Sequence, residues 1–139
     1  MAEPTPIDPQ LMKGVIPYLN VVGASDAAAF YQRAFGAQEM RRMAAEDGKR
    51  LMHCHLLING GSLMLSDSFP EHGYDHQPSH SFTMQLVLAD IDAWWKRAVE
   101  AGCEVTTPLQ LMFWGDRWGA LRDPFGVHWA MNQPAEAAA

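Results

Sequence analysis

Two histidines, His53 and His55, stand two residues apart in a mostly apolar stretch and have the clearest capacity for chemistry. Imidazole titrates near neutral pH and binds divalent metals, so such a pair can act as general acid and base or as a metal site. Successive side chains of a strand point to opposite faces, which places both histidines on one face. We take them as the candidate catalytic residues; simple contact with a ligand or with water is the alternative.

Two tryptophans, Trp114 and Trp118, flank Arg117 near the C-terminal end. Aromatic rings offer stacking area, and a guanidinium holds a carboxylate or phosphate through two hydrogen bonds. This combination indicates a site for a planar or anionic ligand. The structural alternative is that one tryptophan fills the sheet while Arg117 pairs with Asp116 or Asp123.

Three more histidines, His72, His76 and His80, are spaced four residues apart. On a helix they would share a face, but the prolines and the glycine among them disfavour a helix. We expect residues 69–80 to form a surface loop, which is suited to cover the mouth of a cavity.

The elements that position these side chains follow from periodicity. Apolar residues at helical spacing predict a helix over about 27–35 and a second one from about 91 to 102. Alternating or apolar runs predict the strands, at about 15–22, 38–45, 50–58, 61–67, 82–89, 104–109, 112–121 and 127–132.

The same order of elements occurs twice, and matching residues lie 66 positions apart. The matched pairs are Asp26 and Asp92, Gly36 and Gly102, and Gly60 and Gly126. We infer an internal duplication, with βαβββ modules at 14–68 and 81–132 joined by the linker 69–80 within one structural domain. Each module is expected to be a curved, mixed sheet with one helix on its convex side, an α+β fold.

Two segments resemble a known superfamily. These are the strand-to-helix segment Val87–Ala93 and the turn Arg122-Asp123-Pro124-Phe125-Gly126, both similar to the glyoxalase/bleomycin resistance/dioxygenase (vicinal oxygen chelate) superfamily. The segments Phe113–Gly119 and Ile16–Leu19 resemble its PhnB-like branch. The resemblance covers residues 14–132 and implies two tandem βαβββ modules with curved mixed sheets around a cavity.

The resemblance also implies where a divalent metal would be held. The family positions carry over to Pro17, Met64, Thr83 and Ala130, none of which offers the imidazole or carboxylate that such an ion prefers. We therefore expect no metal at the family positions and no cofactor.

The cavity remains without the metal. Strand alternation from the family positions, together with the aromatic and basic segment, predicts which residues line the ligand-binding cavity. These are Met64, Ser66, Thr83, Gln85, Trp114, Arg117 and His128.

Composition narrows the partners. The 139-residue chain has 10 basic against 16 acidic residues and a formal net charge of -6, which disfavours nucleic acid and anionic membranes as partners. No apolar run approaches the roughly 20 residues of a membrane helix. The opening Met1–Pro6 lacks a signal-peptide pattern, so a cytoplasmic location is expected.

Two functions fit these observations. The first is a metal-independent protein that binds a small organic molecule in its cavity; a homodimer is implied by the resemblance. The alternative is an enzyme of lyase, isomerase or dioxygenase type that uses His53 and His55, or a metal at a non-standard position.

Overall fold

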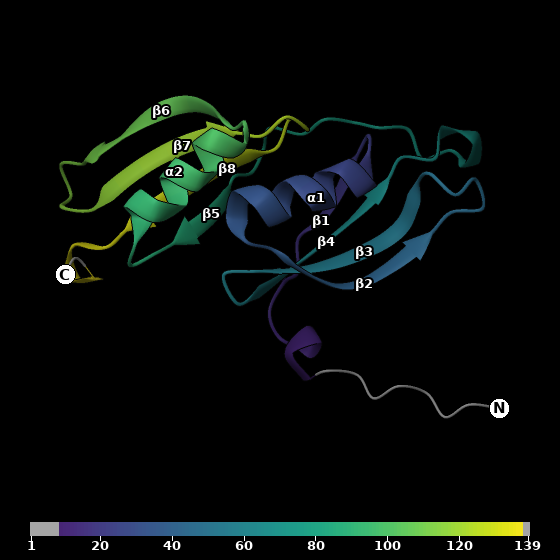
Figure 1. Cartoon of the computed structure of the whole chain (residues 1–139), viewed down its shortest axis with the longest axis horizontal. Coiled ribbons are helices and arrows are strands. Elements are labelled where there is room, and N and C mark those ends of the chain that lie inside the picture. The colour runs from purple at the N-terminus through teal and green to yellow at the C-terminus, as the bar shows by residue number, and fades with distance from the viewer. Residues whose placement is uncertain (1–8, 138–139) are drawn as a thin grey trace.

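The computed structural model describes residues 9–137, and in it the order strand, helix and three strands occurs twice (Figure 1). The first set is β1 (Tyr18–Val21), α1 (Ala24–Phe35), β2 (Gln38–Ala44), β3 (Leu51–Ile58) and β4 (Gly61–Asp67). The second set is β5 (Met84–Val87), α2 (Ile91–Ala101), β6 (Glu104–Leu111), β7 (Arg117–Arg122) and β8 (His128–Gln133). Short 3-10 turns are η1 (Pro9–Met12), η2 (Pro70–His72) and η3 (Ala135–Ala137).

Each set of strands forms its own four-stranded sheet. The strand orders are β1-β4-β3-β2 and β5-β8-β7-β6, with the outer strands β1 and β5 parallel to β4 and β8 and the other pairs antiparallel. The two sheets are separate and lie along the long axis of the molecule (Figure 1). The predicted α+β fold of two βαβββ units with mixed sheets is confirmed.

The helices form because apolar residues recur at the helical period. In α1 the buried side chains include Phe30, Tyr31, Ala34 and Phe35, which face the first sheet and the second helix. The helix ends at Gly36, whose φ of 65° is left-handed and whose N–H donates to the Gln32 carbonyl.

The two sets differ by one residue in helix length. Helix α1 has 12 residues and α2 has 11, so the helices start 67 positions apart while their C-caps, Gly36 and Gly102, are 66 apart. The constant offset of 66 therefore does not hold at the helix starts. It also fails for the first strand, because Tyr18 lies opposite Met64 whereas Gln85, 67 positions later, lies opposite Ala130. This shift changes which residues of β1 and β5 are equivalent.

A buried joint connects the two sets. The Tyr31 hydroxyl of α1 donates to Asp123 Oδ2 at 2.6 Å, and Trp129 Nε1 donates to the same oxygen at 2.9 Å. The Asp123 Oδ1 atom accepts from the backbone N–H groups of Phe125 and Val127. Burial raises the pKa of Tyr31 well above its usual value, and the Asp123 charge raises it further. The Asp-Pro-Phe-Gly turn thus fastens the second sheet to the first helix.

Each sheet has one face against its helix and one face that is open. Strand register defines the first open face as the side chains of the first sheet that point away from α1, namely Tyr18, Asn20, Arg41, Met43, His53, His55, Leu57, Ser62, Met64 and Ser66. The second open face comprises Gln85, Val87, Trp118, Ala120, Arg122, His128, Ala130 and Asn132.

Two local expectations about strands need correction. Alternation along β3 predicts that Met52 faces the helix together with Cys54 and Leu56. Met52 is instead 54% exposed, because the β2–β3 register shifts between Met43 and Ala44 and leaves Met52 in a bulge. The strand expected over 112–121 begins at Arg117 instead. The residues before it form a turn in which Gly115, with a φ of 99°, donates its N–H to the Met112 carbonyl.

None of the helices in the described part of the chain has the length and apolar character needed to cross a bilayer. The segment Met1–Pro6, on which the expected location was based, lies outside the described residues.

Candidate functional site

The first open face carries both candidate catalytic histidines. In β3 the buried side chains of Cys54 and Leu56 point toward α1, and the half-buried His53 and His55 point the other way. The strand pairs with β2 and β4 on its two sides, so neighbouring side chains from both surround the histidines. Sequence alternation correctly placed this pair on one face.

Tyr18 joins His53 in a hydrogen bond. The Tyr18 hydroxyl lies 3.0 Å from His53 Nδ1, and the two rings are tilted at 36° with their centroids 5.7 Å apart. Burial lowers the pKa of His53, and the nearby charges of Arg41 and His55 lower it further. His53 is therefore mainly a neutral imidazole at pH 7, which can accept a proton or a hydrogen bond.

His55 has a different partner. Its Nε2 atom lies 2.9 Å from the Ser62 hydroxyl, and Arg41 stands opposite it on β2. Within residues 9–137, Arg41 makes no ion pair with an acidic side chain. The centre of the first open face thus presents an available cation and two imidazoles, a combination suited to a polar or anionic group of a ligand.

A pocket of about 820 Å³ opens at one end of this face. Its floor includes Asn20, Met52 and Ser66, and its walls come from the β2–β3 turn and the segment after β4. The wall residues are Ala45, Glu46, Asp47, Arg50, Phe69, Glu71, His72 and Tyr74. A volume of this size is typical of small-molecule sites.

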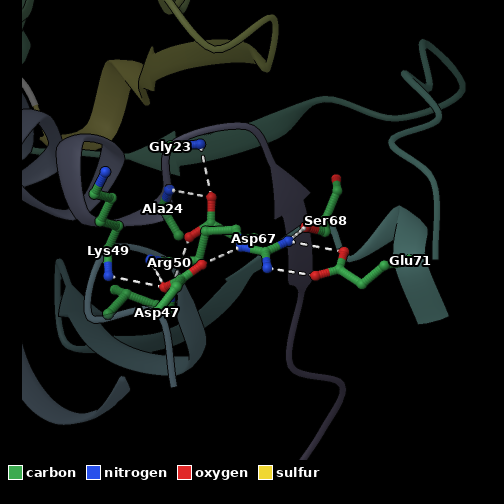
Figure 2. A network of polar contacts seen from close by, with 9 residues as sticks. Gly23, Ala24, Asp47, Lys49, Arg50, Asp67, Ser68 and Glu71 are labelled. Atoms are coloured by element: carbon green, nitrogen blue, oxygen red, sulfur yellow. Dashed lines mark hydrogen bonds and ion pairs between the residues drawn. The ribbon is translucent and has the colours of Figure 1, made fainter. Parts of the chain in front are cut away.

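Arg50 holds the pocket walls together (Figure 2). Its guanidinium donates to both carboxylate oxygens of Glu71, at 3.0 and 2.5 Å, and to Asp47 Oδ2 at 2.7 Å. It also lies 4.4 Å from the centre of the Phe69 ring. Hydrogen bonds from the Arg50 side chain lower the pKa of Glu71 to about 2. The pKa of Asp47 is also lowered to about 2, most of all by hydrogen bonds from the backbone N–H groups of Arg50 and Lys49, and further by the Arg50 side chain. Asp47 and Glu71 therefore stay ionised at any pH near neutrality.

The buried Asp67 also borders the pocket and connects three segments of the chain. Its Oδ1 accepts from the N–H groups of Gly23 and Ala24, and its Oδ2 accepts from the N–H of Leu51 (Figure 2). One carboxylate thereby ties β4 to the start of α1 and to the start of β3. Asp67 is a positioning residue for the pocket, since its oxygens are engaged with backbone.

The two thiols are poor candidates for chemistry. Both Cys54 and Cys103 are buried and unpaired. Burial raises the pKa of Cys54 to about 11 and that of Cys103 to about 12, so neither is a thiolate near neutral pH.

The family metal positions can now be read from strand register. Tyr18 lies opposite Met64 in the first sheet, and Gln85 lies opposite Ala130 in the second. Pro17 and Thr83, to which the resemblance carried the family positions, both precede their strands. None of the register-matched residues supplies imidazole or carboxylate, so they do not fit the family's metal. Across residues 9–137, no group of three or more His, Cys, Asp or Glu side chains could hold a metal ion.

The predicted cavity residues are divided between the two sheets. Met64 and Ser66 lie on the first open face, and Ser66 lines the pocket. Gln85 and His128 lie on the second open face.

The aromatic and basic segment takes up a different position. Trp114 is in the turn between β6 and β7 and is 48% exposed. The Arg117 guanidinium donates to both carboxylate oxygens of Asp92, at 2.7 and 2.9 Å, which is neither of the partners considered from sequence. Its charge thus fastens β7 to the start of α2.

Sequence reasoning missed the Tyr18–His53 contact and the pocket walls. Tyr18 was visible only as part of a motif, and its partner depends on the β1–β4 register. Arg50 and Glu71 are 21 residues apart and joined by a fold contact, for which local spacing carries no signal.

Comparisons with known proteins agree with this geometry. The family model described as Glyoxalase/Bleomycin resistance protein/Dioxygenase superfamily matches residues 15–131. An uncharacterized protein of Mycobacterium tuberculosis strain H37Rv is 42% identical over 124 residues, spanning 85% of this chain and 72% of the relative.

Two solved structures share the fold. The PA1353 protein from Pseudomonas aeruginosa matches with a TM-score of 0.71 and 27% identity, over 86% of this chain and 96% of that one. The PhnB protein from Bacillus cereus matches with a TM-score of 0.70 and 19% identity, over 87% of this chain and 99% of that one.

Proposed function

The chain belongs to the glyoxalase/bleomycin resistance protein/dioxygenase superfamily, and we propose that it binds a small organic molecule on the first open face. The proposed ligand enters the pocket beside Asn20 and Ser66, and binding needs no metal at the family positions. The observation that carries this proposal is the 820 Å³ pocket, which shares Asn20 and Ser66 with the first open face.

The lining suggests what the ligand must offer. Met43 and Met64 of the first open face, together with Met52 of the pocket floor, offer adaptable apolar surface. Arg41 and the Tyr18–His53 pair supply donors and an acceptor for a polar group. A molecule with an apolar body and one polar or anionic substituent matches both features.

We also propose that the protein is a cytoplasmic homodimer, with neither nucleic acid nor membrane as a partner. Large apolar side chains gather at the far end of the second sheet, where Leu111 is 72% exposed and Phe113 is 95% exposed. Exposed apolar groups of this size are commonly covered by a partner, and a second copy is the occupant we propose. Sedimentation at micromolar concentration should give about twice the 15.5 kDa chain mass; a species of only 15.5 kDa would contradict the dimer.

The binding proposal is tested by a thermal-shift screen of chelator-treated protein. One panel holds divalent metals, and the other holds hydrophobic antibiotics, aromatic acids, phosphonates and thiol conjugates. An organic ligand at about 100 times its dissociation constant stabilises the fold by about 2.7 kcal/mol, a rise in melting temperature of about 5–10 °C. Organic compounds that act only after a metal is added would overturn the metal-independent proposal.

A second candidate function rests on the Tyr18–His53 hydrogen bond. A neutral imidazole held by a phenol is a suitable general base, so we propose as the alternative a lyase-, isomerase- or dioxygenase-type enzyme that uses His53 and His55. The test incubates the hits of the organic panel with wild-type protein and with the double variant His53→Ala, His55→Ala, and follows product by NMR. Turnover by wild type alone supports catalysis, and unchanged hits support a binding protein.

A further inference from the structure

Two histidines that are 48 residues apart in sequence meet at the edge of the second open face. His80 Nδ1 lies 3.0 Å from His128 Nε2, and the ring planes cross at 74° with centroids 5.1 Å apart. His128 is the first residue of β8, and His80 comes from the segment that precedes β5. Both rings are accessible, so an ion from solvent can reach the two nitrogens.

We propose that His80 and His128 together bind a divalent first-row transition metal ion. Imidazole nitrogen binds such ions at about 2.0–2.1 Å, so two nitrogens 3.0 Å apart subtend an angle of about 90° at a shared ion. A tetrahedral ion would need a wider angle. Ni²⁺ and Cu²⁺ bind imidazole well and accept two nitrogens at about this angle in cis positions, so these two ions are the probes for the site.

The surroundings permit a cation at this place. Arg122 is the strand partner of His128, and its guanidinium donates to Glu104 Oε2 at 2.5 Å, which offsets the nearest positive charge. The proposed site is distinct from the family positions, because His128 lies two residues before Ala130 and His80 lies outside the strands. It is also separate from the proposed organic-ligand pocket, whose lining residues all lie between Asn20 and Tyr74 and include neither His80 nor His128.

His80 and His128 would occupy only two of the coordination positions of the ion. The described chain provides no cluster of three or more metal-binding side chains, so water fills the remaining positions around the ion. Two ligands give weaker binding than the closed sites of structural metals, and they leave adjacent positions open to an oxygen-bearing ligand.

The test uses the full chain, free of tags and stripped with chelator, titrated separately with Ni²⁺ and Cu²⁺ by calorimetry. The expected result is one ion per chain, with nitrogen hyperfine coupling in the Cu²⁺ EPR spectrum. His80→Ala and His128→Ala should each weaken binding by about tenfold or more, a loss of about 1.4 kcal/mol. The matched controls, His72→Ala in the same segment and His53→Ala on the first sheet, should bind as wild type does.

Melting temperatures of the variants establish that each one is folded, and His80→Ala changes only an exposed loop side chain. Absence of saturable binding by wild type would overturn the proposal. So would unchanged binding by either His80→Ala or His128→Ala, because a shared ion needs both nitrogens. Organic-ligand binding measured in chelator is independent of these outcomes, so the two proposals fail or stand separately.

Discussion

The two sheets of this protein have the same strand order, yet their corresponding ends are built from different chemistry. In the first sheet the last residue of β4 is Asp67, whose buried carboxylate accepts three backbone N–H groups. In the second sheet the last residue of β8 is Gln133, whose side-chain oxygen accepts one backbone N–H group, that of Ile91, at 3.0 Å. Both residues tie the last strand to the start of a helix.

The connections differ more than the strands do. In the first sheet the β2–β3 turn and the segment after β4 are drawn together by Arg50 and enclose a pocket. In the second sheet the β6–β7 turn carries Phe113 and Trp114, whose rings contact each other and are largely exposed. The two sheets thus share a strand order while their loops differ, and loops are where binding residues usually lie.

The largest expected effect comes from breaking the joint between the two halves. Asp123→Ala leaves four buried or half-buried donors without their acceptor, so we expect a loss of about 3–5 kcal/mol in the free energy of unfolding. Urea denaturation measures it. Tyr31→Phe removes one donor and leaves the carboxylate bonded, so its cost should be about 1 kcal/mol. An Asp123→Ala variant within 1 kcal/mol of wild type would show that the joint contributes little.

A second comparison uses one glycine from each sheet. A Cβ at Gly119 would lie 2.5 Å from Trp95 and 3.0 Å from the Leu109 backbone, whereas a Cβ at Gly61 would meet only the Ile58 carbonyl, at 3.7 Å. Gly119→Ala should therefore cost about 1–3 kcal/mol of stability, the usual range for overpacking. Gly61→Ala should change stability by less than about 0.5 kcal/mol. Equal costs would mean that the Trp95 contact does not restrict this position.

These outcomes bear on how much the sequence could predict. Alternation along Leu51–Ile58 correctly placed His53 and His55 on one face, because a strand buried on one side imposes that pattern. Met52 does not follow this alternation, because a bulge depends on the pairing of two strands and has no signature in the local sequence.

The prediction of equivalent residues in the two halves was limited in the same way, because it too depends on strand pairing. The glycines that end the helices are 66 positions apart, but α1 has one residue more than α2, and the strand registers match Tyr18 to Gln85, which are 67 apart. The Arg50–Glu71 contact was unpredictable because long charged side chains can pair with any acid that the fold brings near. Periodicity therefore predicted the scaffold, and tertiary contacts determined the pocket.

Substitution of one arginine beside each sheet tests which sheet binds the organic ligand. Arg50 and Arg117 each hold a carboxylate at a partly exposed site, so Arg50→Gln and Arg117→Gln should each change stability by less than about 1 kcal/mol. Arg50→Gln frees the pocket wall and should weaken organic-ligand affinity by about tenfold, as measured by calorimetry with a hit of the organic panel. Arg117→Gln should bind that compound as wild type does; a loss there would place the ligand on the second sheet.

The smallest expected effect concerns pH and the first sheet alone. The pKa of His53 is lower in the fold than its ordinary value of 6.5, so the unfolded chain takes up this proton first as pH falls. The contribution of neutral His53 to the free energy of unfolding is present above pH 6.5. It is lost as pH falls from 6.5 through the pKa of His53 in the folded protein. The difference in unfolding free energy between pH 7.5 and pH 5 should be smaller in His53→Gln than in wild type. An identical difference would exclude His53 as a contributor.

The central claim, metal-independent binding on the first sheet, is tested most directly by thermal shift in chelator with two bulky variants. Ser66→Trp fills the pocket, whereas Val87→Trp places the same side chain at an exposed position of the second open face. The account predicts that the strongest organic compound of the panel raises the melting temperature of wild type and Val87→Trp by several degrees and leaves Ser66→Trp unchanged. A shift that survives in Ser66→Trp, or that requires added metal, would contradict it.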